Sequence, residues 1–260
     1  MVSLLVAAFF VLCTIPGVAG VSASPLGQTP NAETLLTQSG QALSETTSFR
    51  LEGAVEMGTA SRGSTVSMAF PLTGEFVAPD RAHLGLDAAA LGFDFEAVMI
   101  GQTVWVRMNG ESWDTVNGMN LGSGSPAAGS SFMDTQGDAG RYLRDPRVVE
   151  EGGLYRITGT IDVEEAIAGV TPPPDLAARF GAPTSIGRGM GMPNMAGSTI
   201  GFVYLIDRAT MYPSSMELTM TLPDMPSFSG GASRPSEVTI TVRITYRDFN
   251  DPSIAVDAPV

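Results

Sequence analysis

The residue types that carry most enzymatic chemistry are nearly absent from this chain. His83 is the only histidine and Cys13 the only cysteine, so neither a histidine cluster nor an intrachain disulfide can form. There is no lysine for a Schiff base or a Walker A loop, and no Gly-x-Ser-x-Gly segment, the nucleophile motif of many hydrolases. These features predict a protein that is not an enzyme and uses no catalytic residue, metal or cofactor.

Two other features bear on chemistry. Gly187, Gly189 and Gly191 are spaced like a nucleotide-binding loop, but no predicted strand precedes them and Pro193 follows, so the usual context of such a loop is missing. The 27 acidic residues could include a carboxylate pair at the spacing of a glycosidase. A hydrolase that uses two carboxylates is therefore a further hypothesis, testable by mutating paired acids at any cleft.

The charge of the chain argues against a nucleic-acid partner. Fourteen basic residues, all arginine, face 27 acidic ones, and the formal net charge is -13. Such a surface repels phosphate backbones and anionic lipid headgroups.

Alternation of apolar and polar residues is the dominant pattern. From Glu237 to Tyr246 it runs without a break, which is typical of a strand with one apolar and one polar face. Similar segments, ended by Gly, Pro or Asn, predict strands at 51–57, 66–72, 82–86, 93–100, 104–108, 154–161, 198–206, 216–222 and 237–248. Asn109-Gly110 predicts a type I′ hairpin that joins 104–108 to 111–113. The pattern therefore predicts a large antiparallel sheet whose apolar face must be covered.

A helix is predicted before the first strand. Its start is expected at Thr29-Pro30, with Pro30 at the first helical position and Glu33 in the first turn. Four apolar residues share one side of this helix and are expected to pack on the sheet: Ala32, Leu35, Leu36 and Leu43.

His83 and Trp105 each lie between apolar strand residues, so both should point away from the apolar face. A structural role is expected for each. Trp105 is predicted to rest under a helix or to line the rim of a pocket.

The chain is predicted to hold one folded domain behind an export signal. Residues 1–23 are read as a signal peptide or an N-terminal anchor, because the apolar run from Val2 to Leu12 is broken early by Pro16-Gly17. A Ser/Pro/Gly linker at 24–30 precedes the domain at 31–260. Segments 117–140 and 171–197 interrupt the strand pattern and are predicted to be flexible loops, either flaps at a cavity mouth or plain disorder.

An ordered series of short motifs resembles the LppX/LprG-type lipoproteins, which are relatives in fold of the LolA and LolB carriers. The similar pieces are Leu43–Gly53, Ala78-Pro79-Asp80-Arg81, Ile100–Arg107 with Trp113, Leu154–Thr160, and Tyr246–Asn250 followed by Asp257-Ala258-Pro259. The resemblance implies a mainly β (α+β) fold, in which a few helices cover the open side of a curved antiparallel half-barrel and enclose an apolar, lipid-sized cavity. Cys13 follows Phe10-Val11-Leu12 rather than a small residue, so lipidation at Cys13 is not expected.

The leading hypothesis is a non-enzymatic carrier of acylated lipids or lipoproteins in the bacterial cell envelope. The protein would be exported and would meet a membrane surface transiently or through an N-terminal anchor. Methionine is frequent, and its flexible thioether suits a cavity with variable guests as well as an ordinary core. The residues predicted to line the cavity are Val55, Met68, Phe70, Phe95, Val106, Met216, Leu218, Met220 and Ile240. The alternative is an envelope sensor or protein-interaction module on the same scaffold, with a filled core and no lipid cargo.

Overall fold

The computed structural model describes residues 30–61, 64–101, 103–116, 143–162, 199–225 and 236–259. The predictions for residues 1–23, the linker up to residue 29, and the loops 117–140 and 171–197 lie outside these ranges. No helix in the described ranges is long and apolar enough to cross a membrane.

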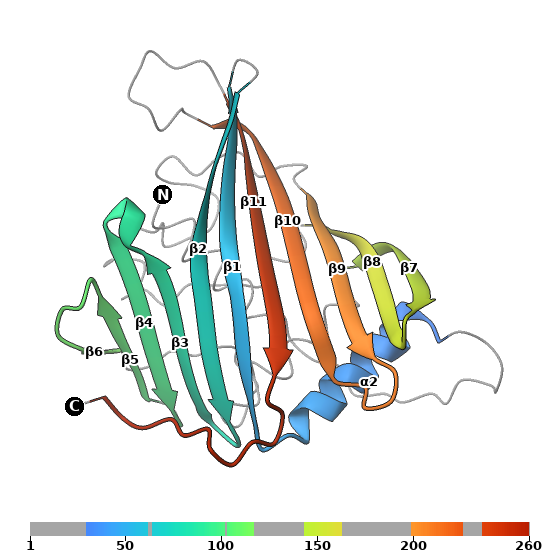
Figure 1. Cartoon of the computed structure of the whole chain (residues 1–260), viewed down its shortest axis with the longest axis horizontal. Coiled ribbons are helices and arrows are strands. Elements are labelled where there is room, and N and C mark those ends of the chain that lie inside the picture. The colour runs from blue at the N-terminus through green and yellow to red at the C-terminus, as the bar shows by residue number, and fades with distance from the viewer. Residues whose placement is uncertain are drawn as a thin grey trace.

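The described chain forms one antiparallel sheet of 11 strands in the order β6-β5-β4-β3-β2-β1-β11-β10-β9-β8-β7 (Figure 1). The strands are β1 Ser48–Ser61, β2 Ser64–Val77, β3 Arg81–Ala88, β4 Phe93–Ile100, β5 Thr103–Met108, β6 Asp114–Val116, β7 Leu143–Glu151, β8 Leu154–Asp162, β9 Thr199–Asp207, β10 Pro213–Met225 and β11 Ser236–Arg247. A single 3₁₀ turn, η1 Ala89–Leu91, links β3 to β4. The sheet is open, because β6 and β7 lie at its two edges.

Two up-and-down halves meet in the middle of the sheet. Strands β1 to β6 follow one another outward on one side, and β7 to β11 approach the centre from the other. The pairing of β1 with β11 joins them, with Val55 opposite Val242 and Met57 opposite Ile240. The mainly β class and the antiparallel sheet predicted from the alternation are confirmed.

Alternation also separates the two faces of the sheet. In β1, Val55 and Met57 point to one face and Glu52 and Glu56 to the other, and the register continues this division into β11. We call the side of Val55 the apolar face and the side of Glu56 the polar face.

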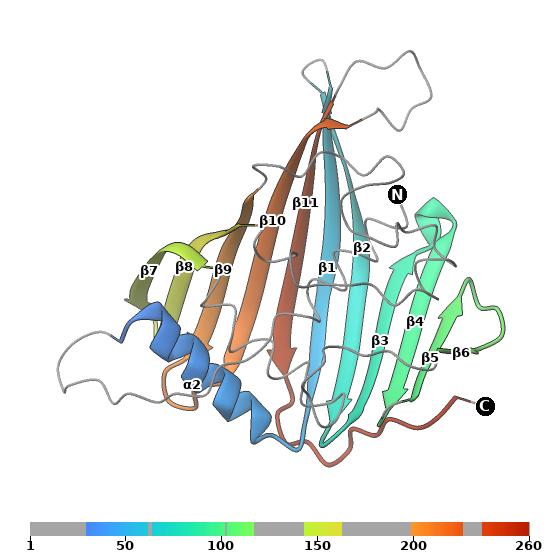
Figure 2. The same cartoon turned by 180° about the vertical axis from the view of Figure 1, so that it is seen from behind.

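The helix α2 Ala32–Ser44 lies across the apolar face, over the lower part of strands β7 to β10 (Figure 2). Its predicted apolar stripe is confirmed, since Ala32, Leu35, Leu36 and Leu43 are all buried. The predicted start is wrong: the helix begins at Ala32, because the Asn31 side chain caps it by accepting a hydrogen bond of 2.7 Å from the Thr34 N–H. Pro30 lies before this cap.

The C-terminal segment after β11 runs along the lower edge of the sheet, past the ends of β1 and its neighbours (Figure 1). Arg81 Nη1 donates a hydrogen bond of 3.0 Å to the Val256 carbonyl, and Ile254 and Val256 are buried. The segment is thereby fixed as part of the domain core.

The predicted hairpin is confirmed in its turn but not in its returning strand, and one edge strand was missed. The turn at Asn109-Gly110 has both residues at positive φ and a 2.9 Å hydrogen bond from the Glu111 N–H to the Met108 carbonyl, as predicted for a tight hairpin. The returning strand, however, starts at Asp114 rather than at Glu111. Strand β7 was not predicted, because it lies at the sheet edge with most residues exposed and therefore shows no alternation.

Candidate apolar binding face

The nine residues predicted to line a cavity all lie on the apolar face. Val55 is opposite Phe70 on one side, and Met57 is opposite Met68 and Ile240. From Ile240 the same face continues through Met220, and from Val242 through Leu218. On the other side, Leu86 is opposite Phe95, and Ala97 is opposite Val106. The strand register thus brings them to one surface, and their lining of a lipid cavity stays a prediction.

The apolar face carries two packed cores. The larger one lies over β1 to β5, β10 and β11, and includes Leu43 of the helix. The smaller one lies between α2 and strands β7 to β9, with Leu35, Leu36, Ile157 and Phe202 at its centre. Both are closed to solvent: Phe70 is 1% exposed and Ile157 is 0% exposed.

A seam of three side chains from β10 joins the cores. Met216, Leu218 and Met220 pack against both cores, yet each keeps an intermediate exposure. They alternate with Glu217 and Thr219, which point to the polar face. Along this seam, partly exposed apolar side chains therefore connect one core to the other.

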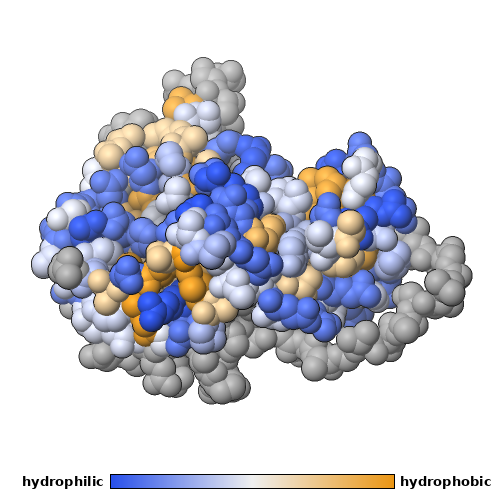
Figure 3. All heavy atoms as spheres, turned by 60° about the horizontal axis from the view of Figure 1, so that its bottom comes forward, coloured by the Kyte–Doolittle hydropathy of each residue, from blue (hydrophilic) through white to orange (hydrophobic). Residues whose placement is uncertain are grey.

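Methionines make up much of the partly exposed apolar surface. Met68, Met99, Met108, Met216 and Met220 are partly buried against the larger core, whereas Met57 within that core is buried. Unbranched thioethers adapt to guests of different shape. In Figure 3, which looks toward the lower end of the molecule, apolar residues form small groups between polar ones rather than one broad patch.

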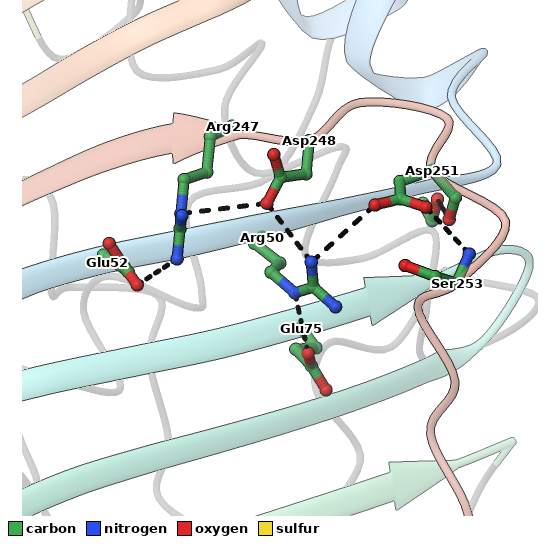
Figure 4. A network of polar contacts seen from close by, with 8 residues as sticks. Arg50, Glu52, Glu75, Arg247, Asp248, Asp251 and Ser253 are labelled. Carbon is green, nitrogen blue, oxygen red and sulfur yellow. Dashed lines mark hydrogen bonds and ion pairs between the residues drawn. The ribbon is translucent and has the colours of Figure 1, made fainter.

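The polar face is held by arginine–carboxylate pairs between neighbouring strands. Arg50 Nε donates to Glu75 at 2.9 Å and Nη1 lies 3.3 Å from Asp248, while Arg247 pairs with Glu52 (Figure 4). The hydrogen bond to Glu75 raises the pKa of the Arg50 guanidinium. Each of these arginines is paired with carboxylates from neighbouring strands or the strand ends, so the ion pairs link adjacent strands across the polar face.

Two hydroxyl groups lie within the smaller core under the helix. Ser39 is 1% exposed and Tyr204 is 2% exposed. Burial raises the pKa of the Tyr204 phenol, and the nearby Ser39 hydroxyl lowers it. Neither residue was predicted from the sequence, although Ser39 is a polar residue within the apolar stripe of the helix.

His83 and Trp105 lie on the opposite face of the sheet from the seam. His83 is opposite Glu75 and Val98, and Trp105 is opposite Val98 and Thr115, so both point away from the apolar face as predicted. No group of three or more metal-ligating side chains occurs among the residues that the structure describes. Arg107 lies over the Trp113 ring at 4.7 Å and pairs with Glu96 at 2.6 Å, which fixes the start of β6.

Comparison with known proteins gives structural likeness only. No protein-family model matches the chain, and no curated protein is similar to it in sequence. Among solved structures, LprF from Mycobacterium bovis is similar with 12% identity and a TM-score of 0.43, over 88% of this chain and 96% of that one. A LolA superfamily protein from Nitrosomonas europaea has 12% identity and a TM-score of 0.30, over 87% and 96%.

A DUF1329 family protein from Desulfovibrio piger has 10% identity and a TM-score of 0.30, over 87% of this chain and 96% of that one.

Proposed function

We propose that this protein binds an acyl chain of a lipid or lipoprotein on its apolar face and carries it without catalysis. The observation that supports this proposal is the seam of Met216, Leu218 and Met220, which leaves partly exposed apolar side chains between two packed cores. A ligand laid along the seam would contact both cores at once.

The hydrophobic effect is sufficient to hold such a ligand. Burial of a methylene group contributes about 0.8 kcal/mol, so a sixteen-carbon chain contributes on the order of 12 kcal/mol before the entropy of binding is subtracted. A lipid that crosses water without a protein loses this contribution. Carriage therefore needs an apolar surface that can be closed and reopened, and it needs no reactive side chain.

The cell envelope is the proposed location. An N-terminal signal or anchor in residues 1–23 would export the domain, and a membrane would act as donor or acceptor of the lipid. The formal charge of -13 opposes lasting adsorption to anionic lipids, which suits a carrier that must leave the membrane again.

Binding is tested by native mass spectrometry of the gently purified full chain, followed by displacement of a fluorescent fatty acid. The variants are Leu218→Gln, which places an amide in the seam, and Thr219→Gln, which places the same group one residue away on the polar face. We expect Leu218→Gln to weaken probe binding about tenfold or more and Thr219→Gln to change it less than twofold.

A chain that carries no lipid and ignores the added fatty acid would overturn the proposal. In that case the filled cores would favour the protein-interaction alternative. If Leu218→Gln unfolds the protein, Met220→Gln at the edge of the same seam is the second variant, with Thr221→Gln as its polar-face control.

A further inference from the structure

Strand β7 leaves one edge of the sheet open to solvent, because it is the last strand on its side (Figures 1 and 2). Its first half is blunted by Pro146 and by the bulge between Arg144 and Arg147, features that oppose strand pairing. From Arg147 to Glu151 the strand has no proline and no bulge. Within it Val149 is 53% exposed, one of two strongly exposed large apolar residues among those that the structure describes. We call Arg147–Glu151 the open half of β7, and this half can accept a further strand.

The backbone groups that point outward from the open half follow from the hairpin of β7 with β8. The two-residue turn Gly152-Gly153 has positive φ at both positions, as in a type I′ hairpin. In such a hairpin the two residues that flank the turn, here Glu151 and Leu154, hydrogen-bond to each other, and every second residue along the strand repeats this arrangement. The N–H and C=O groups of Val148 and Glu150 therefore point away from β8, toward the open edge.

The side chains of the open half have an order of charge that is complementary to itself. Arg147, Val149 and Glu151 point to the polar face, since Val148 between them is opposite the buried Ile157 of the apolar face. Neither Arg147 nor Glu151 forms an ion pair with a residue in the described ranges. When a second copy lies antiparallel with the two Val149 side chains face to face, each Arg147 is directly opposite the Glu151 of the other copy.

We propose that two copies of this chain pair through the open half of β7 in this register and form one continuous sheet, with a two-fold axis at Val149. The same register brings Val148 of one copy opposite Glu150 of the other, so their outward backbone groups can hydrogen-bond in both directions. Such an interface is small, and the net charge of -13 on each copy opposes it. We therefore expect a weak dimer with a dissociation constant of about 100 µM at physiological salt. The dimer goes beyond the proposed function, since it needs no bound lipid.

Sedimentation of the full chain over a range of concentrations measures the association. Arg147→Glu and Glu151→Arg each turn both ion pairs of the dimer into contacts between like charges, so each variant alone should dimerise about tenfold more weakly. An equimolar mixture of the two variants restores opposite charges at both contacts and should associate about as strongly as the unmodified protein. The control is Arg156→Glu on β8, which makes the same change of charge as Arg147→Glu on a strand whose two edges are occupied. It should change the dissociation constant about twofold or less.

The mixture decides whether the register is right. If the two variants associate no better together than apart, Arg147 does not lie opposite Glu151 and the proposal is wrong. A chain that stays monomeric at about 1 mM would overturn it as well, and the open edge would then be left for a strand of a different protein. Self-association that both variants keep unchanged would come from another surface and would also reject the pairing. Should either charge variant fail to fold by circular dichroism, Val149→Lys, which brings two ammonium groups together at the axis, must weaken the dimer about tenfold.

Discussion

Asn250 Oδ1 accepts a hydrogen bond of 2.8 Å from the backbone N–H of Thr47, across 203 positions of sequence. Thr47 precedes β1 and Asn250 follows β11, so this contact closes the lower end of the central strand pair. The same side chain donates to the Tyr212 hydroxyl at 3.2 Å, and the Asn250 N–H donates to the Ser48 carbonyl at 2.8 Å. One residue thus ties the C-terminal segment to both halves of the sheet.

Asn250 is predicted to stabilise the domain through its side chain and its backbone conformation together. Its φ is 60°, a left-handed value that asparagine and glycine tolerate best. Asn250→Gly removes the hydrogen-bonding side chain without straining the backbone, and it should lower the free energy of unfolding by about 1–3 kcal/mol. Asn250→Ala should cost about 1 kcal/mol more, because the alanine is also strained. Urea denaturation followed by circular dichroism measures both.

Asn250→Asp is the control for this pair of variants. It keeps the acceptor for Thr47 and loses the donor to Tyr212, so it should destabilise the protein least. Equal stability of all four proteins would show that the contact contributes nothing to the fold.

Gly53 is predicted to be irreplaceable because the backbone of β11 passes directly over it. A Cβ atom at this position would lie 1.9 Å from the Arg243 carbonyl oxygen. Gly53→Ala should therefore destabilise the domain by about 3 kcal/mol or more, at the upper end of the overpacking range, since backbone must move. In Gly58→Ala, on the same strand, the added Cβ meets Thr239 O at 3.9 Å, an ordinary contact.

Thermal unfolding of both glycine variants distinguishes close approach from a general effect of glycine in a strand. Gly58→Ala should be neutral or slightly stabilising, because alanine restricts the unfolded chain. If the two variants lose the same stability, the close approach of β1 and β11 at Gly53 is not a constraint on the fold.

Strand interiors were predictable from sequence because burial on one face imposes a period of two. Where that condition fails, the prediction failed as well. Strand β7 is an edge strand whose residues Arg144 to Arg147 are exposed and interrupted by a bulge, so nothing in its composition distinguishes it from a loop. The helix start was misplaced because Pro30 is a strong signal, while the Asn31 cap that decides the boundary is a single local hydrogen bond.

The candidate site was only partly predictable for a related reason. Alternation placed all nine apolar residues on one face, but it carries no information on which of them are sealed in a core. Phe70 and Ile240 are fully buried, whereas Met216 and Leu218 remain partly exposed, and this difference arises from packing between distant strands and the helix. Ser39 could have been noticed as a polar residue in an apolar helical stripe.

The ion pairs of the polar face are predicted to contribute little stability individually. Arg243 Nε lies 2.7 Å from Glu217 and Nη1 lies 2.5 Å from Glu56, which raises the pKa of the guanidinium through the hydrogen bond to Glu217 first. All three side chains are at least 40% exposed, so water and salt screen them. A double-mutant cycle of Arg243→Gln and Glu217→Gln should give a coupling of about 0.2–1 kcal/mol.

Raising the salt concentration to about 1 M should remove most of that coupling, because the screening length then shrinks to about 3 Å. A coupling free energy above about 2 kcal/mol, or one that persists at high salt, would contradict this prediction. It would mean that the pair is shielded from water, as it would be under a partner bound to the polar face.

The turn between β9 and β10 is predicted to weaken in acid. The Asp207 carboxylate accepts hydrogen bonds from the Thr210 N–H at 2.9 Å, the Thr210 hydroxyl at 2.9 Å and the Ala209 N–H at 3.0 Å. These bonds, the one from the Thr210 backbone above all, hold the pKa of Asp207 below its ordinary value of 3.8. The pKa is thus lower in the folded than in the unfolded chain.

The stabilisation of the folded state by the Asp207 carboxylate is therefore fully present above the unfolded pKa of about 4. It is lost as the pH falls through the lower pKa of the folded state. Carboxyl-carbon chemical shifts measured against pH should give an Asp207 pKa below 3.8, and Thr210→Val should move it upward, because the hydrogen bond from the Thr210 hydroxyl to the carboxylate is lost. In the unmodified protein, the hydrogen-exchange protection of the Ala209 amide should fall as Asp207 becomes protonated. Asp207→Asn should remove this dependence. An Asp207 that titrates at its ordinary value in the folded protein would mean that the three hydrogen bonds do not hold the turn in solution.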